Sequence, residues 1–122
     1  MKTIQIINNN HPEIKIAANW CDSFLSKFKV LMFVPTLEKN TGIILVENSE
    51  SKLNTAIHML FMNFDITTVW INSSIQVVDT CLAKKGHLSY FPKKPSQYVL
   101  EIHADHLQDF QIGDQLSFVN EK

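Results

Sequence analysis

The residues best suited to chemistry lie in one short apolar segment that reads AIHMLFMNFD. His58 and Asp65 are its titratable side chains, and Met62 lies between them. A carboxylate can orient an imidazole for proton transfer, so these residues are candidates for an acid–base pair. Imidazole and thioether groups also bind copper, to which Met32 or Cys81 could contribute a further sulfur. The segment is therefore the first candidate for a functional site.

Each of these residues also has an ordinary structural interpretation. Methionine commonly fills irregular gaps in a core. A carboxylate at the start of a strand often accepts backbone N–H groups of the preceding turn, and we favour this role for Asp65. A buried histidine with both nitrogens hydrogen-bonded would serve packing alone, and for His58 this alternative and a site role both stay open.

Other catalytic and metal-binding signals are missing from the sequence. No G-x-S-x-G motif is present, and neither Cys21 nor Cys81 has a basic neighbour that would lower its pKa. The cysteines also lack zinc-ligand spacing, and we predict no resident metal or other cofactor. His87, His103 and His106 share no spacing, which predicts surface positions.

The sequence favours a small binding or accessory module over an enzyme. We expect a crevice near His58 and Asp65, with Met62 or Met32 as its apolar floor, that takes a small molecule or a peptide. The alternatives are a small enzyme that uses the His58/Asp65 pair, and a copper-binding protein that uses His58 and methionines. An enzyme would also need a nucleophile or an open metal position, and the sequence marks neither.

Length and composition exclude several classes of protein. The 122 residues, 45% of them hydrophobic, predict one folded domain over 1–122. A net charge of −1 argues against a nucleic-acid partner. The apolar runs are too short to span a membrane, and no signal peptide is recognisable, so we expect a cytoplasmic protein with reduced cysteines.

Alternating apolar residues and turn clusters predict an all-β fold, a compact sandwich or rolled barrel of about seven to eight short strands. One or two short helices are expected, at Asp22–Val30 and Asp105–Phe110. The pattern contains no strand–helix–strand alternation that would support a parallel sheet. The hairpin Asp65–Ala83 is apolar on both faces, which predicts a central position. The clearest strands are Lys2–Ile7, Glu13–Asn19, Thr41–Glu47, Asp65–Asn72, Ile75–Ala83, Gln97–His103 and Gln115–Val119.

Two further features concern the surface. Glu101 alternates with apolar neighbours, which predicts a solvated strand face where Lys93 or Lys94 would pair with it. The aromatic stretch Tyr90–Pro92 lies in a basic loop, where it would either form a recognition surface or pack onto the sheet.

The order of several short motifs resembles the microbial family known as domain of unknown function 192, from about Trp20 to Phe118. This chain departs from the usual Trp-Met-Lys-Asn motif by having His58-Met59 in that region. The resemblance implies a compact β-sandwich-like fold and carries no known activity. The motifs are Leu31-Met32, Gly42-Ile43-Ile44, Ile57-His58-Met59 with Met62, Asp65, the loop Tyr90–Pro95, Tyr98-Val99-Leu100-Glu101 and Gly113-Asp114.

Overall fold

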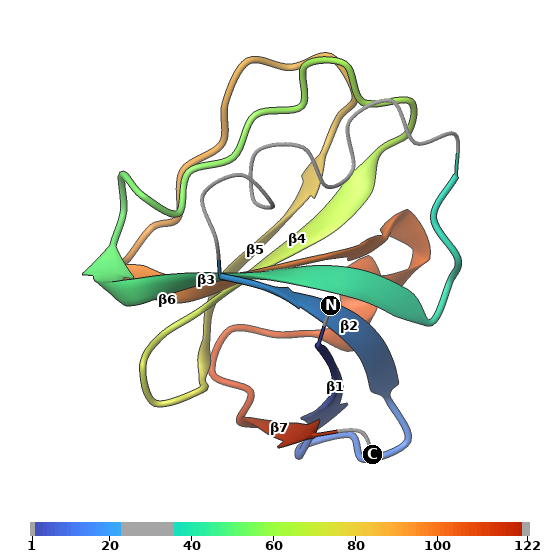
Figure 1. Ribbon diagram of the computed structural model, residues 1–122, viewed down its shortest axis with the longest axis vertical. Helices are drawn as coiled ribbons and strands as arrows, with labels where there is room; N and C mark the ends of the chain where they lie inside the picture. Colours follow the sequence, from blue (N-terminus) through green and yellow to red (C-terminus); the bar gives the residue numbers. More distant parts are fainter. Residues whose placement is uncertain (1, 23–35, 121–122) are drawn as a thin grey trace.

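The computed structural model describes residues 2–22 and 36–120. Within these residues the chain forms β-strands and one short 3-10 helix (Figure 1). The all-β fold with few helices, predicted from the sequence, is confirmed. The elements are β1 (Thr3–Asn8), β2 (Lys15–Cys21), β3 (Thr41–Ser51), β4 (Ile66–Ile71), β5 (Val77–Ala83), β6 (Ser96–His103), η1 (Ala104–Asp109) and β7 (Leu116–Asn120).

The strands form one mixed sheet in the order β5-β4-β6-β3-β2-β1-β7. All neighbours are antiparallel except β2 and β3, which run parallel with Ala17 opposite Thr41. The expectation of no parallel pairing was wrong. Parallel neighbours need a long connection, and residues 22–40 join these two strands.

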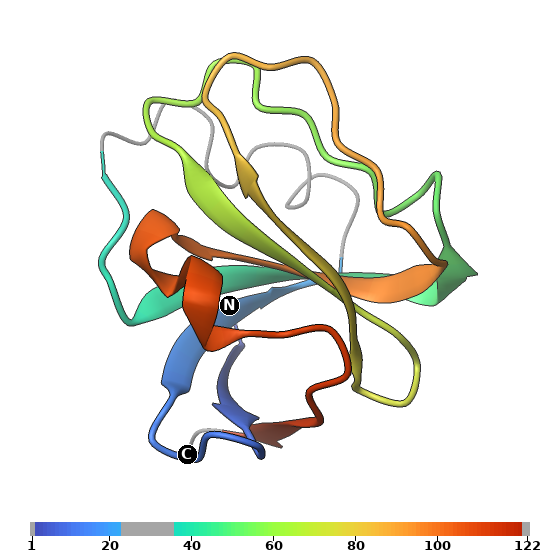
Figure 2. The same ribbon diagram turned by 180° about the vertical axis from the view of Figure 1, so that it is seen from behind.

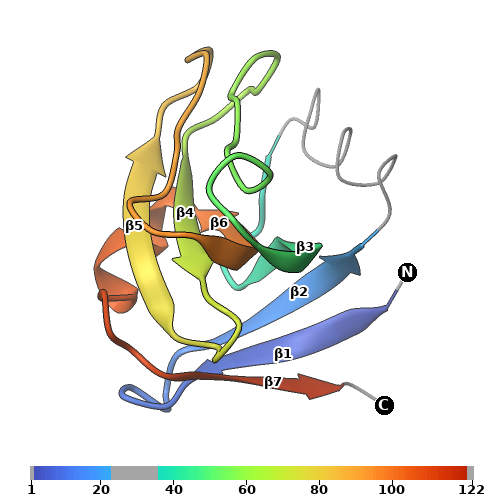
Figure 3. The same ribbon diagram turned by 90° about the vertical axis from the view of Figure 1, so that its left-hand side faces the viewer.

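The sheet is strongly curved, so that its two edges approach each other at one end (Figure 3). Val77 N donates to Asp114 O at 2.9 Å, and Leu116 N donates to Ile75 O at 2.9 Å. These bonds link the start of β5 to the start of β7 without closing a barrel. The inside of the curve holds the first core, and η1 lies beside β4 and β5 (Figure 2). The buried residues of the first core are Ile4, Ile6, Ile16, Ala18, Ile44, Val69, Ile71, Val77, Leu100, Ile102, Phe110 and Leu116.

A second core lies on the opposite face of the sheet. Two long loops, residues 52–65 and 84–95, supply Ile57, Met59 and Tyr90 to it. Trp70 Nε1 on β4 donates to Thr55 O at 2.7 Å, which fastens the first loop to the sheet. The sheet is thus covered on both faces. The buried members are Cys21, Ile43, Ile57, Met59, Ile66, Trp70, Ala83 and Val99.

The predictions for individual elements had mixed outcomes. The helix expected at Asp105–Phe110 is confirmed as η1, while most of Asp22–Val30 lies outside the described residues. Every residue of β4 is buried, as expected for the hairpin Asp65–Ala83. Its second strand, β5, is however an edge strand and not central. Val78 and Cys81 on β5 are apolar because they pack against the second core.

Candidate functional site

The loops 52–65 and 84–95 hold each other and form one surface, which we call the paired-loop surface. The two loops run side by side in Figure 1. Ile57 and Tyr90 exchange backbone hydrogen bonds, and Met59 N donates to His87 O at 2.9 Å. Alternate residues therefore face inward and outward, as in a strand. The outward side carries large exposed hydrophobic side chains, namely Leu53 (75% exposed), Leu60, Phe61 (60%), Leu88 (74%) and Phe91.

His58 lies on this outward side. It stands between the buried Ile57 and Met59, and its own side is exposed. The alternative of a satisfied core histidine was therefore wrong. In the part of the chain that the structure describes, His58 makes no hydrogen bond and no ion pair, with Asp65 or with any other residue.

Asp65 holds the start of the second loop. Its Oδ1 accepts the backbone N–H of Lys85 at 2.9 Å, and Lys84 Nζ lies 3.4 Å from Oδ2. The hydrogen bond from Lys85 N is the main cause that keeps the pKa of the Asp65 carboxyl below its ordinary value. Tyr90 Oη fixes the same turn by accepting Lys84 N at 2.9 Å. Asp65 therefore accepts a backbone N–H as the sequence favoured, but from the turn at Lys84 and Lys85 and not from the preceding turn.

The predicted methionines have different settings. Met62 is partly buried and packs against the second core, while Met32 lies outside the described residues. Within 2–22 and 36–120 the structure contains no group of three or more His, Cys, Asp or Glu residues placed to hold a metal ion.

The paired-loop surface is also basic. Its two loops contain five lysines and one carboxylate, Asp65, so their formal charge is +4 while that of the whole chain is −1. The remainder of the chain accordingly carries −5. Lys84 and Lys93 are more than half exposed at their side chains, although each lies near a carboxylate, Asp65 and Asp79 respectively. Positive charge therefore borders the exposed hydrophobic side chains.

A second group of polar residues lies on the face of the sheet that carries the second core, where the sequence did not predict one. We call this face the enclosed face. Glu101 on β6 stands opposite Thr68 on β4, and Thr68 in turn stands opposite Cys81 on β5. Glu101 belongs to the face that carries Val99 and the second core, so the predicted solvated strand face was wrong. The signal was present in the sequence, because β6 has apolar residues on both parities and such strands are covered on both sides.

Burial changes the pKa values of Glu101 and Cys81, which form a cross-strand row with Thr68 between them. Desolvation by the surrounding protein raises the pKa of the Glu101 carboxyl to about 7, although the residue keeps part of its surface open to solvent. Desolvation, with a smaller effect from the Asp79 charge, raises the pKa of the Cys81 thiol to about 11. Cys81 is thus a thiol at neutral pH and not a nucleophilic thiolate. Cys21 and Cys81 are not joined in a disulfide, as predicted.

The Thr68 hydroxyl is a further unusual feature of this row. Among the described residues it is the one buried side-chain oxygen or nitrogen atom without a hydrogen bond. The Cys81 sulfur lies near enough for the hydroxyl to lower the thiol pKa slightly, but sulfur is a weak partner and no bond of ordinary geometry forms. The Thr68 hydroxyl thus leaves its donor and acceptor capacity unused in the middle of the sheet.

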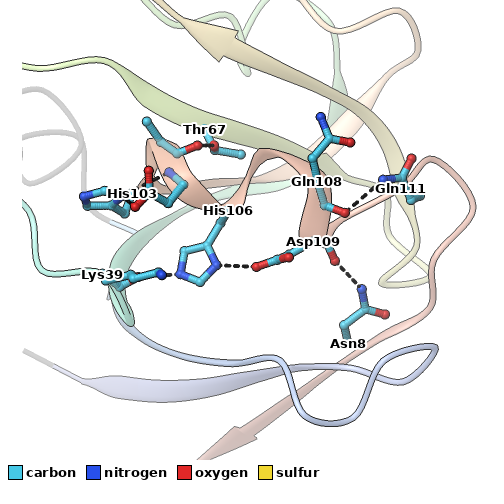
Figure 4. A network of polar contacts seen from close by, with 10 residues as sticks. Asn8, Lys39, Thr67, His103, His106, Gln108, Asp109 and Gln111 are labelled. Carbon is cyan, nitrogen blue, oxygen red and sulfur yellow. Dashed lines mark hydrogen bonds and ion pairs between the residues drawn. The ribbon is translucent and has the colours of Figure 1, made fainter.

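A third polar group surrounds His106, which is buried and not on the surface as predicted (Figure 4). Its Nδ1 lies 2.7 Å from Asp109 Oδ2, and its Nε2 lies 2.5 Å from Lys39 O. Asn8 Nδ2 donates to Asp109 O and to Asp114 Oδ2, at 2.9 Å each. Because both ring nitrogens already have partners, this network ties η1 to its neighbours and offers no free catalytic group.

Comparison with known proteins agrees with the resemblance found in the sequence. Residues 5–118 match the model of DUF192, a family described as an uncharacterized ACR. The chain belongs to the DUF192 family. A UPF0127 protein of Thermococcus kodakarensis, TK1120, is 37% identical over 110 residues, which are 88% of this chain and 66% of that protein. A UPF0127 protein of Pyrococcus furiosus, PF1050, is 31% identical over 87% of this chain and 90% of its own length.

Two solved structures share the fold of this chain. A proposed transcription regulator of Sinorhizobium meliloti superimposes with a TM-score of 0.82 at 13% identity, over 96% of this chain and 92% of that chain. A protein of unknown function from Novosphingobium aromaticivorans superimposes with a TM-score of 0.75 at 16% identity, over 94% and 83% of the two chains. At such identities the likeness concerns the fold alone.

Proposed function

We propose that this protein is a binding module that docks an acidic segment of another protein on the paired-loop surface. The observation that carries the proposal is the cluster of exposed Leu and Phe side chains on two loops that hold each other, bordered by lysines. Contiguous apolar surface is unusual on a monomer and often marks an interaction site. The adjacent lysines favour a partner with negative charge.

The surface has the composition of a protein interface. Aromatic side chains such as Phe61 and Phe91 are enriched at the energetically important centres of interfaces, and a charged rim sets orientation and association rate. Nucleic-acid interfaces are more polar, and their affinity depends on many phosphate contacts. An apolar centre with few lysines therefore favours a protein partner.

The predicted site residues take distinct roles in this proposal. His58 lies among the exposed side chains and would contact the partner directly. Asp65 would act through the loop, because it holds the turn at Lys84 and Lys85. Met62 would support the loop from beneath. A cytoplasmic location is part of the proposal, and within the described residues no helix is long and apolar enough to cross a membrane.

Binding of a defined peptide tests this function. The probe is a synthetic peptide of alternating Glu and Leu, compared with the same peptide carrying Lys in place of Glu, by fluorescence anisotropy at low and high salt. The Glu peptide should bind more tightly, and salt should weaken it. The double variant L88S/F91S should lower its affinity at least tenfold. The control I112S removes a 57%-exposed side chain outside the paired loops and should leave the affinity unchanged.

Three results would contradict the proposal. They are equal loss in the I112S control, preference for the Lys peptide, and tighter binding of a single-stranded oligonucleotide or of anionic lipid vesicles than of the Glu peptide. The last result would assign the surface to nucleic acid or to a membrane.

A further inference from the structure

Glu101 and Thr68, on the face of the sheet with the second core, support a second proposal that does not depend on the paired-loop surface. We propose that Glu101 and Thr68 form a binding site for a cationic nitrogen group, an ammonium or guanidinium carried on a short apolar stem. The two residues stand directly opposite each other on β6 and β4. Side chains in such a cross-strand pair have Cβ atoms about 4.5–5.5 Å apart, so one small group can reach both.

The first argument is that neither side chain has a partner. In the described part of the chain no hydrogen bond or ion pair reaches the Glu101 carboxyl, and the Thr68 hydroxyl is equally unsatisfied. Buried polar groups in native proteins are nearly always hydrogen-bonded, so the buried Thr68 hydroxyl, which stands opposite a carboxylate, calls for a ligand or another specific reason. Thr68 is fully buried while Glu101 keeps part of its surface open, which gives the pair one accessible side.

The second argument concerns the groups around the pair. The opposite neighbour on β3 is Ile43, the next residue of the row is the protonated thiol Cys81, and His103 farther along β6 turns its Nδ1 to Asp105 N. None of these supplies a positive charge to the carboxylate. Since Lys84 and Lys93 lie beside Asp65 and Asp79, the missing cation has no source among the described residues.

The chemistry of the pair selects the ligand. A carboxylate accepts charge-assisted hydrogen bonds from N⁺–H groups, and a threonine oxygen accepts a further one. An anion would meet a carboxylate with no compensating cation, which excludes it. The neighbouring Ile43, Val99 and Trp70 are apolar and suit an alkyl stem. Desolvation raises the pKa of the Glu101 carboxyl to about 7, and a bound cation would favour its charged form.

Titration with small amines tests the site. The probes are propylammonium and guanidinium at low millimolar concentration and constant ionic strength, against their neutral counterparts 1-propanol and urea. The readout is the carboxyl ¹³C chemical shift of Glu101 in protein labelled at glutamate. The cations should shift this signal saturably and lower the apparent pKa of Glu101, while the neutral probes should do neither. Because a group with a pKa of about 7 is mostly protonated at pH 6, affinity should fall about tenfold between pH 8 and pH 6.

Two variants make the result specific. E101Q, followed by the backbone amide signals of Thr68 and Ile43, should weaken propylammonium binding at least tenfold. T68V removes the hydroxyl without changing the shape and should weaken it several-fold. The control E13Q changes an exposed carboxylate, 73% exposed at its side chain, and should bind as the wild type does.

The inference is overturned if 1-propanol binds as well as propylammonium, if neither cation moves the Glu101 signal, or if T68V and E13Q bind alike. Because propylammonium binding is read at Glu101 and peptide binding is read with different probes and different variants, failure of this inference leaves the proposed docking function standing, and the reverse also holds.

Discussion

Ile57 and Tyr90 exchange two backbone hydrogen bonds, at 2.9 and 2.8 Å, although the whole β4–β5 hairpin separates them in the chain. Two long loops are thereby made into one strand-like pair without belonging to the sheet. Their outward side chains are held in fixed positions, which lowers the entropy that a binding surface loses when it meets a partner. This is the physical reason that we assign the docking role to these loops and not to the turns at the other end of the sheet.

Shortening a side chain inside the first core should destabilise the protein. Val77 is 1% exposed at the start of β5, where the curved sheet meets β7. V77A should cost about 1–3 kcal/mol of unfolding free energy through the cavity that it leaves. Chemical denaturation measures the change, with V119A as the control because Val119 is 44% exposed. An equal midpoint for V77A and the wild type would contradict the core assignment.

Gly42 is expected to tolerate no side chain, since it lies opposite Ile102 where β3 and β6 approach closely. A Cβ at this position would come within 2.6 Å of Ile102 Cγ2 and 2.7 Å of the Glu101 carbonyl oxygen. G42A should therefore lower the unfolding free energy by about 1–3 kcal/mol, because a backbone oxygen cannot move aside alone. S49A, at an exposed position on the same strand, is the matched control for denaturation. A neutral G42A would mean that the two strands can separate at little cost.

Asp65 should make the second loop sensitive to acid. Its pKa is lowered in the folded state, mainly by the hydrogen bond from Lys85 N, so its contribution is present above the ordinary value of 3.8 and is lost as pH falls through the folded value. D65N should lower the thermal midpoint at pH 7, and the difference from the wild type should shrink below pH 4. The Asp65 side chain is 32% exposed and solvent screens its interactions, so the effect should be small. A difference that stays constant down to pH 2 would contradict this role.

The sequence was sufficient to predict most strands but not the way in which they pair. Alternation and turn residues mark individual strands well, as for the segment that became β6, since they report local burial. The parallel pairing of β2 with β3 depends on contacts between distant segments, and no local pattern records it. The edge position of β5 was missed for the same reason, because Val78 is covered by the second core and not by a further strand.

The candidate sites divide in the same manner. His58 stood out because its type is unusual in an apolar segment, yet the sequence could not tell that the alternation of Ile57 and Met59 would turn it outward. Glu101 was assigned to solvent because charged residues usually are exposed. Its burial follows from the central position of β6, which only the strand order reveals.

Glu101 provides the last prediction, which concerns the response of stability to pH. Its pKa is 4.5 in its ordinary state and about 7 in the folded protein, raised by desolvation. Between these values the folded state binds more protons than the unfolded state, so the unfolding free energy should decrease as pH rises from about 5 to 8. E101Q removes this titration and should be more stable than the wild type at pH 8, by about 1–3 kcal/mol, with the difference shrinking toward pH 5. Urea denaturation of both proteins across this range measures the difference, in which the shared titration of the histidines cancels. A difference in unfolding free energy that does not change with pH would mean that the Glu101 carboxyl is hydrated in the folded protein. It would contradict the claim that desolvation raises its pKa.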